Sequence, residues 1–143
     1  MAGIETPVCN NRALREAGRR LNQFYDQFLA PSGLRATQFS LLASLKRLGP
    51  IGIQALASEL GLDRTTLGRN ILPLERDGLI LVEPDAEDRR GKRLRLSAAG
   101  LERLARARPL WAKAQQGFEA AFGAERAAQL RELLAEVSRL DPG

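Results

Sequence analysis

Histidine is absent from this 143-residue chain. Its absence removes the commonest general base, the commonest nitrogen ligand of transition metals and every catalytic triad built on histidine. Cysteine occurs once, as Cys9, so the chain contains no CxxC pair for zinc and cannot form an intramolecular disulfide. We therefore expect no metal site and no cofactor, and a reducing cytoplasm as the setting.

Long apolar runs are also missing. No stretch approaches the roughly 20 apolar residues that a helix needs to cross a bilayer. Residues 1–6 lack the basic start and apolar core of a signal peptide. The sequence therefore predicts a cytoplasmic protein without a membrane partner.

Catalysis without histidine would depend on paired carboxylates or an activated lysine. The acidic residues of this chain mostly fall at the ends of expected helices or beside arginines, where helix capping accounts for them. We therefore expect that the protein is not an enzyme.

Basic residues, by contrast, are plentiful and concentrated. The net charge is +5 and the isoelectric point is about 10.3, a balance that favours polyanions such as nucleic acid. Residues 89–95 contain five cations and no acid. A hydrophobic content of 44% indicates one folded domain with its own core.

Apolar spacing and turn residues predict six helices and one hairpin. The hairpin strands at 79–82 and 93–96 flank a charged loop at 83–92. Gly61 separates the third helix from the fourth, which Asp63 can cap, and a tight glycine-containing turn between two helices is typical of a helix-turn-helix. The predicted helices span residues 10–30, 36–48, 54–60, 64–77, 98–122 and 124–140.

The fourth helix presents a polar face opposite its apolar stripe. At 100° per residue, Leu67, Ile71 and Leu74 face inward, and arginines and threonines lie on the other side. Such residues suit phosphates and base edges. Pro73 predicts a bend, because it cannot donate a hydrogen bond to the Arg69 carbonyl. The residues of this helix that we expect to contact DNA are Arg64, Thr65, Thr66, Arg69 and Arg76.

The terminal helices lie outside this compact unit. The last one carries an apolar stripe that includes Leu130, Leu134 and Val137. Ordinary core packing explains such a stripe. A surface for a partner explains it equally well, because a lobe of three helices and a hairpin needs little of the terminal helices.

Several separated motifs resemble those of the multiple antibiotic resistance regulator (MarR) family. The hairpin reads D-R-R at 88–90, L-R-L-S at 94–97 and glycine at 100, which is similar to that family's D-x-R…V-x-L-T-x-x-G pattern. The segments L-A-S-E-L-G at 56–61 and L-E-R-D-G-L-I at 74–80 also match family segments. The resemblance covers nearly the whole chain, in helix order and in length.

The resemblance implies a mainly α fold with a small β-hairpin (α+β): a winged helix-turn-helix with N- and C-terminal dimerisation helices. Residues 1–143 then form a single domain, with the DNA-binding lobe at 36–97 and the dimerisation helices at 10–30 and 98–140. The implied partners are a second copy of the chain, a pseudo-palindromic operator in double-stranded DNA, and a small aromatic or phenolic effector that releases the DNA. Such proteins usually repress genes.

The resemblance also assigns roles in the wing. Arg90 matches an arginine that enters the minor groove, where the negative potential attracts it, and Asp88 matches the acid that orients it. The alternative is a solvated surface ion pair. The wing residues that we expect at DNA are Asp88, Arg89, Arg90, Lys92 and Arg93.

For the effector, we expect a pocket where the first and fifth helices meet the DNA-binding lobe. Candidate contacts are Arg15 and Arg19, which can hold a carboxylate, and Trp111, which can stack on an aromatic ring. The alternative for Trp111, and the more common role of such a residue, is a place in the dimer core. Cys9 leaves a second hypothesis open, a thiol-based redox-sensing repressor, beside the simpler interpretation of a small buried apolar residue.

A third class is an interaction module, since winged-helix lobes also bind proteins or RNA. Thr65, Arg69 and Arg90 favour duplex DNA, because they lie on two elements that enter adjacent grooves.

Overall fold

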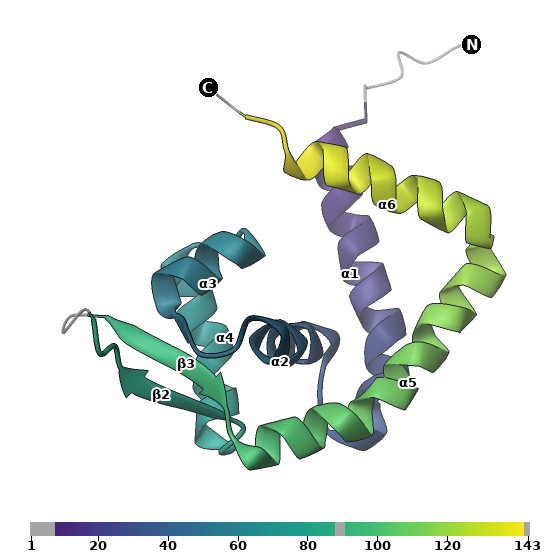
Figure 1. The fold of residues 1–143 in the computed structure, drawn as a ribbon. Helices are drawn as coiled ribbons and strands as arrows, with labels where there is room; N and C mark the ends of the chain where they lie inside the picture. The colour runs from purple at the N-terminus through teal and green to yellow at the C-terminus, as the bar shows by residue number, and fades with distance from the viewer. Residues whose placement is uncertain (1–7, 88–90, 142–143) are drawn as a thin grey trace, which may run out of the picture.

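The computed structural model describes residues 8–87 and 91–141. It contains the predicted helical framework, with a short 3-10 turn after the first helix and a small sheet (Figure 1). In chain order the elements are α1 (Asn10–Leu29), η1 (Ala30–Ser32), α2 (Ala36–Leu48), β1 (Ile51–Gly52), α3 (Ile53–Leu60), α4 (Arg64–Arg76), β2 (Ile80–Pro84), β3 (Lys92–Leu96), α5 (Ala98–Phe122) and α6 (Ala124–Ser138).

The helix boundaries follow the capping and breaking residues. Asp63 caps α4 and Ser97 caps α5, each by accepting a backbone N–H three residues later. Gly61, in the left-handed conformation at φ 65°, ends α3. The predicted ranges of α2 and α5 are confirmed, whereas α6 ends at Ser138, two residues before the predicted end at Leu140. α4 runs through Pro73 without interruption.

The sheet has one more strand than predicted. β1 pairs antiparallel with β3, through Ile51 opposite Leu94, so the order is β1-β3-β2. β2 and β3 form the predicted hairpin, but the ladder reaches Pro84 opposite Lys92 and leaves a shorter loop than expected. A strand of two residues has no alternating pattern to reveal it, because only its pairing defines it.

The core of the lobe formed by residues 36–97 lies where α2, α3, α4 and the sheet meet. Leucines dominate it, and the stripe of Leu67, Ile71 and Leu74 faces inward as the helical spacing predicted. α5 adds Leu104 and Ala107 to the same core. The largest fully buried side chains are Leu29, Leu42, Leu45, Leu56, Leu67, Leu74, Leu79, Ile80, Leu94 and Leu104.

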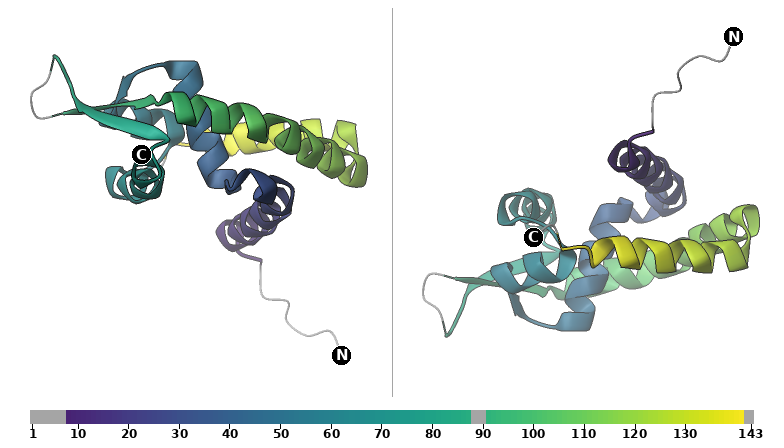
Figure 2. Two further views of the ribbon diagram at one scale, coloured as in Figure 1. Left: turned by 90° about the horizontal axis from the view of Figure 1, so that it is seen from below. Right: turned by 90° about the horizontal axis from the view of Figure 1, so that it is seen from above.

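The terminal helices form an arm beside the lobe. α1 packs along α5, and α6 turns back from the end of α5 at Gly123 (Figure 1). The two views of Figure 2 show α6 lying apart from α1. α6 exposes apolar side chains, with Leu133 59% and Val137 47% accessible.

Candidate nucleic-acid interface and pocket

The outward face of α4 is open and mostly polar, and it carries one exposed apolar side chain, Leu72. Arg64, Thr65, Arg69 and Arg76 are exposed, and Thr66 is half-buried. Thr65 and Arg69 are four residues apart and therefore lie on one side of the helix. Arginine and threonine at this spacing present charge and hydroxyl groups that suit phosphates and base edges.

Asp63 fixes the start of this helix. Its carboxylate accepts the Thr66 backbone N–H at 2.7 Å and the Thr66 hydroxyl at 2.9 Å. These hydrogen bonds, the backbone one first, hold the pKa of Asp63 below its usual value. The Thr66 hydroxyl proton is thus already used by the cap, which leaves Thr65 as the threonine whose side chain is free to turn outward.

The wing is a two-stranded ribbon that extends beyond the lobe (Figure 1). Lys92 is exposed at its far end, opposite Pro84. Arg93 is half-buried and donates from Nη2 to the Pro50 carbonyl at 3.0 Å, so it ties the wing to the loop before β1. The predicted contacts Asp88, Arg89 and Arg90 lie outside the described residues.

An exposed ion pair spans the wing. Arg95 on β3 contacts Glu83 on β2, with Nη2 2.8 Å from Oε1 and Nε donating to the same oxygen at 3.0 Å. An exposed pair of this kind is worth at most about 1 kcal/mol. Its effect is to neutralise one of the wing arginines.

A pocket of about 410 Å³ lies between the arm and the lobe, where α1, α2 and α5 meet. Aromatic rings form part of its wall: Trp111 on α5 stacks on Phe39 of α2, with ring centroids 5.8 Å apart and an interplanar angle of 17°. The lining residues are Tyr25, Ala36, Phe39, Ser40, Ala43, Ser44, Arg47, Arg108 and Trp111.

Two cations accompany these rings. Arg47 lies in the last turn of α2, and Arg108 lies three residues before Trp111 on α5. The two arginines therefore line one pocket from different helices. Ser40 and Ser44 supply hydroxyl groups on the same wall. A cavity with aromatic walls and two guanidinium groups fits a flat organic anion, because the rings stack and each guanidinium can hold a carboxylate.

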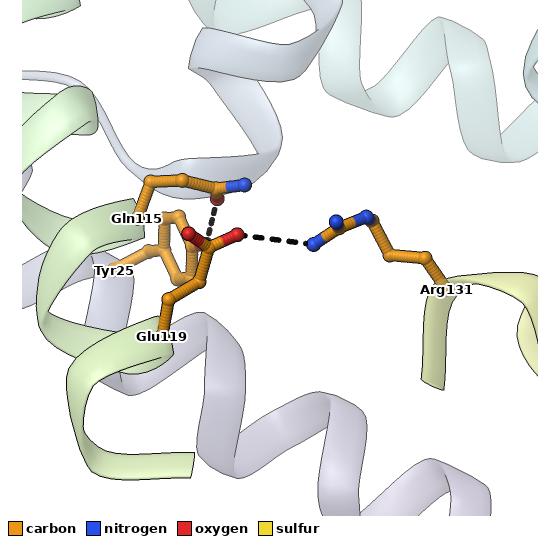
Figure 3. Close-up of polar contacts among 4 residues, drawn as sticks. All are labelled: Tyr25, Gln115, Glu119 and Arg131. Atoms are coloured by element: carbon orange, nitrogen blue, oxygen red, sulfur yellow. Dashed lines mark hydrogen bonds and ion pairs between the residues drawn. The ribbon is translucent and has the colours of Figure 1, made fainter. Parts of the chain in front are cut away.

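Tyr25 connects this pocket to the far end of the arm. Its hydroxyl donates to Oε1 of Gln115 on α5 (Figure 3). Glu119, one turn further along α5, pairs with Arg131 on α6 at 3.2 Å. Burial first, and then the Glu119 charge, raise the pKa of Tyr25 above its usual value, although Arg131 acts in the opposite direction.

The predicted effector contacts separate in the structure. Trp111 lines the pocket, whereas Arg15 and Arg19 are exposed on α1 and are not among the lining residues. Arg108 carried a usable signal, since it lies three residues before Trp111 on the same helix. Arg47 carried none, because a helical wheel does not say which helix lies opposite.

Cys9 is exposed at the position that precedes α1. In the single chain, the interpretation of Cys9 as a small buried residue is therefore not met. The backbone carbonyl of Cys9 accepts the Ala13 N–H at 3.0 Å, so the thiol lies at the amino end of a 20-residue helix.

Neither a cluster of potential metal ligands nor a membrane-spanning helix occurs in the described ranges, 8–87 and 91–141. No group of three or more potential metal ligands occurs there. No helix in the same ranges is long and apolar enough to cross a membrane.

Comparison with known proteins places these features in a family. The MarR family model matches residues 34–92, which run from just before α2 to the first residue of β3. One similar structure is the crystal structure of the transcriptional regulator MosR from M. tuberculosis in complex with DNA. The MosR chain is 39% identical to this chain, with a TM-score of 0.76, and the match covers 93% of this chain and 100% of MosR. The chain belongs to the MarR family of DNA-binding transcriptional regulators.

More distant MarR-family structures share the fold. A mutant of MarR from E. coli complexed with operator DNA is 23% identical, covers 89% of this chain and 91% of that chain, and has a TM-score of 0.79. The PcaV regulator from Streptomyces coelicolor, in complex with its natural ligand, is 23% identical to this chain and has a TM-score of 0.83. The match covers 96% of this chain and 97% of PcaV. The winged helix fold is thereby confirmed.

Proposed function

We propose that this MarR-family protein is a homodimeric repressor that binds a pseudo-palindromic operator and is released from it by a small aromatic acid. The observation that carries the DNA-binding part is the open face of α4, where Thr65 and Arg69 point away from the core beside a basic wing. In this proposal α4 enters the major groove through Arg64, Thr65, Thr66, Arg69 and Arg76. In the wing, Arg90 enters the adjacent minor groove and Asp88 orients it, and Arg89, Lys92 and Arg93 contact the DNA around it.

Dimerisation supplies the second half-site. The arm leaves apolar side chains of α6 uncovered, and a second copy of the chain is the partner that the family resemblance implies. Two lobes joined through α1, α5 and α6 would contact two half-sites about 10 base pairs apart. Symmetry of the protein then matches symmetry of the operator.

The effector class follows from the pocket. The Phe39–Trp111 stack accepts a flat ring, and Arg47 and Arg108 neutralise a carboxylate. The pocket lies between arm and lobe, so an occupant that favours another spacing of the two lobes weakens DNA binding. A coupling free energy of about 1–3 kcal/mol, or roughly 5–150-fold in affinity, is sufficient.

The test uses a duplex from the region upstream of the protein's own gene. Benzoate should change the fluorescence of Trp111, the single tryptophan, and weaken the protein's affinity for this duplex. Benzyl alcohol, which keeps the ring and lacks the carboxylate, should do neither. An Arg108→Gln variant should bind the duplex normally but respond much less to benzoate. A parent protein that fails to bind the duplex would refute the DNA-binding proposal.

Redox sensing through Cys9 is a second candidate function. The exposure of the thiol favours it, because an oxidant can reach an exposed cysteine. The single cysteine limits the oxidised forms to a sulfenic acid, a mixed disulfide or a bridge between subunits. If hydroperoxide releases DNA from the parent but not from Cys9→Ser, and benzoate releases neither, Cys9 is the sensor.

A further inference from the structure

A second cleft, of about 360 Å³, lies between the start of α2 and the outer side of α4. Only one of its residues, Arg69, was expected at DNA from the sequence. The cleft is polar on nearly every side, unlike the aromatic pocket. Its lining residues are Arg35, Thr37, Gln38, Arg69, Asn70 and Pro73.

The cleft carries two positively charged side chains, Arg35 and Arg69. Arg35 and Arg69 are exposed, and within the described ranges neither of them forms an ion pair with a carboxylate. None of the six lining residues is acidic. Asp26 on α1 is engaged at this end of α2, where it accepts the Ala36 backbone N–H at 2.7 Å, and it does not line the cleft.

Hydrogen-bond donors predominate among the remaining groups. Gln38 uses Oε1 to accept the Arg35 backbone N–H at 2.9 Å, which leaves its NH₂ group as the free end of the amide. Thr37 and Asn70 add a hydroxyl and an amide from the two facing helices. Two guanidinium groups with hydroxyl and amide donors match the oxygens of a phosphate.

The position of the cleft identifies the source of that phosphate. Arg69 lies four residues after Thr65 and four before Pro73, so the cleft continues the face of α4 that carries the proposed base contacts. A helix that occupies the major groove has the phosphates of one strand running beside it. Those phosphates would pass the start of α2, where Arg35 is located.

We propose that this cleft binds one phosphate of the DNA backbone, and that Arg35, Thr37 and Gln38 on α2 hold it together with Arg69 and Asn70 on α4. The proposal rests on the proposed DNA-binding function. It adds α2 as a third element of the interface, beside the reading helix and the wing. Because a phosphate contact is independent of sequence, Arg35 positions the protein on DNA and does not select the operator.

The experiment compares Arg35→Ala with the parent on the operator duplex and on a scrambled duplex over a range of salt concentrations. We expect binding to both duplexes to weaken by a similar factor, about 3–10-fold, and the slope of log K against log salt to fall by about one. Arg35→Lys, which keeps the charge, should retain the slope. Thr37→Val, which removes only the hydroxyl, should weaken both duplexes by about twofold and provides a second measurement if Arg35→Ala misfolds.

The matched control is Lys46→Ala, which removes one exposed charge from the last turn of the same helix. It should bind as the parent does, because it lies about 16 Å from Arg35 along α2. An Arg35→Ala variant with parental affinity and slope would overturn the proposal. A second result would also overturn it: inorganic phosphate raises the Tm of the parent but not of Arg35→Ala, and the dependence of DNA binding on salt is the same in both proteins. The cleft would then bind a free anion and not a phosphate of DNA. Failure of the parent to bind either duplex would instead refute the proposed function.

Discussion

Gly100 lies so close to the carbonyl oxygen of Leu79 that a Cβ at position 100 would be only 2.1 Å from that oxygen. The same carbonyl accepts the Ser97 backbone N–H at 3.1 Å, and the Ser97 hydroxyl donates to the Gly78 carbonyl. The first turn of α5 is therefore fixed onto the turn that follows α4. This joint connects the start of α5 to the segment that directly follows α4.

Gly100→Ala tests this joint. The added methyl group must push α5 away from Leu79, and overpacking of this kind lowers the free energy of unfolding by about 1–3 kcal/mol. Urea denaturation without DNA measures the change. Gly68→Ala is the matched control: Gly68 also lies in a helix, but a Cβ at position 68 would have no neighbouring atom within 4 Å, so alanine there should raise stability by about 0.5–1 kcal/mol. Equal changes in the two variants would show that the Leu79 contact is not tight.

The helices could be predicted because their ends are marked locally. Gly49 and Pro50 end α2, and Ser97 starts α5, so both ranges follow from neighbouring residues. β1 could not be predicted, since it exists only through its pairing with β3. The glycine at position 100 was visible as part of a motif, but its reason is a contact with Leu79, twenty-one residues earlier.

The residues of the candidate pocket could likewise be predicted only in part, because they depend on contacts between distant segments. Its position between the arm and the lobe was expected, and Trp111 is on its wall. Arg47 and Arg108, rather than Arg15 and Arg19, supply its charges, because the packing of α2 against α5 decides which arginines meet. Helical spacing identifies a face of one helix and leaves the facing helix undetermined.

Tyr25 should ionise at a higher pH than an ordinary tyrosine. Burial and the Glu119 charge both disfavour the phenolate, so its pKa lies above the usual value of about 10. Because the folded state keeps the proton longer than the unfolded state, the stability that this group supplies is present at lower pH and is lost as the pH rises through the raised pKa. The chain has one tyrosine, so an ultraviolet titration reads Tyr25 alone.

Two variants separate the effects of Glu119 and Arg131 on the pKa of Tyr25. Glu119→Gln should lower the pKa of Tyr25 toward its usual value, and Arg131→Gln should raise it further, because these two charges act on the phenolate in opposite directions. Glu132→Gln, a change in an exposed α6 acid, should leave the titration unchanged. Shifts of the same sign in Glu119→Gln and Arg131→Gln would contradict this arrangement.

Arg69 and Arg90 should affect DNA binding differently. Arg90→Ala should weaken operator binding by about 1–3 kcal/mol without changing the Tm, because the proposed role of Arg90 is a contact with DNA, and Asp88→Ala should weaken it less. Arg69→Ala, tested on an operator library, should relax the preference at one position if Arg69 reads a base. If Arg69 instead holds the phosphate of the proposed cleft, the variant should weaken all sequences alike and lower the salt slope by about one. Parental affinity of Arg90→Ala at physiological salt would remove the wing from the interface.

The uncovered face of α6 should hold two copies of the chain together. Leu133 is 59% accessible and Val137 47%, and both lie on the last helix of the arm. A Leu133→Asp, Val137→Asp double variant should sediment as a monomer at micromolar concentration, because two buried charges per subunit would face an apolar partner surface. Its operator affinity should fall toward its affinity for a scrambled duplex, since one lobe reaches only one half-site.

The control for this variant is Leu72→Asp, in which a comparably accessible leucine, at 63%, lies on α4 within the reading lobe. This variant should remain a dimer, because α4 faces DNA in the proposed complex and not the second copy. A parent protein that sediments as a well-folded monomer would contradict the dimer itself. A double variant that remains dimeric would instead move the interface from α6 to α1 and α5.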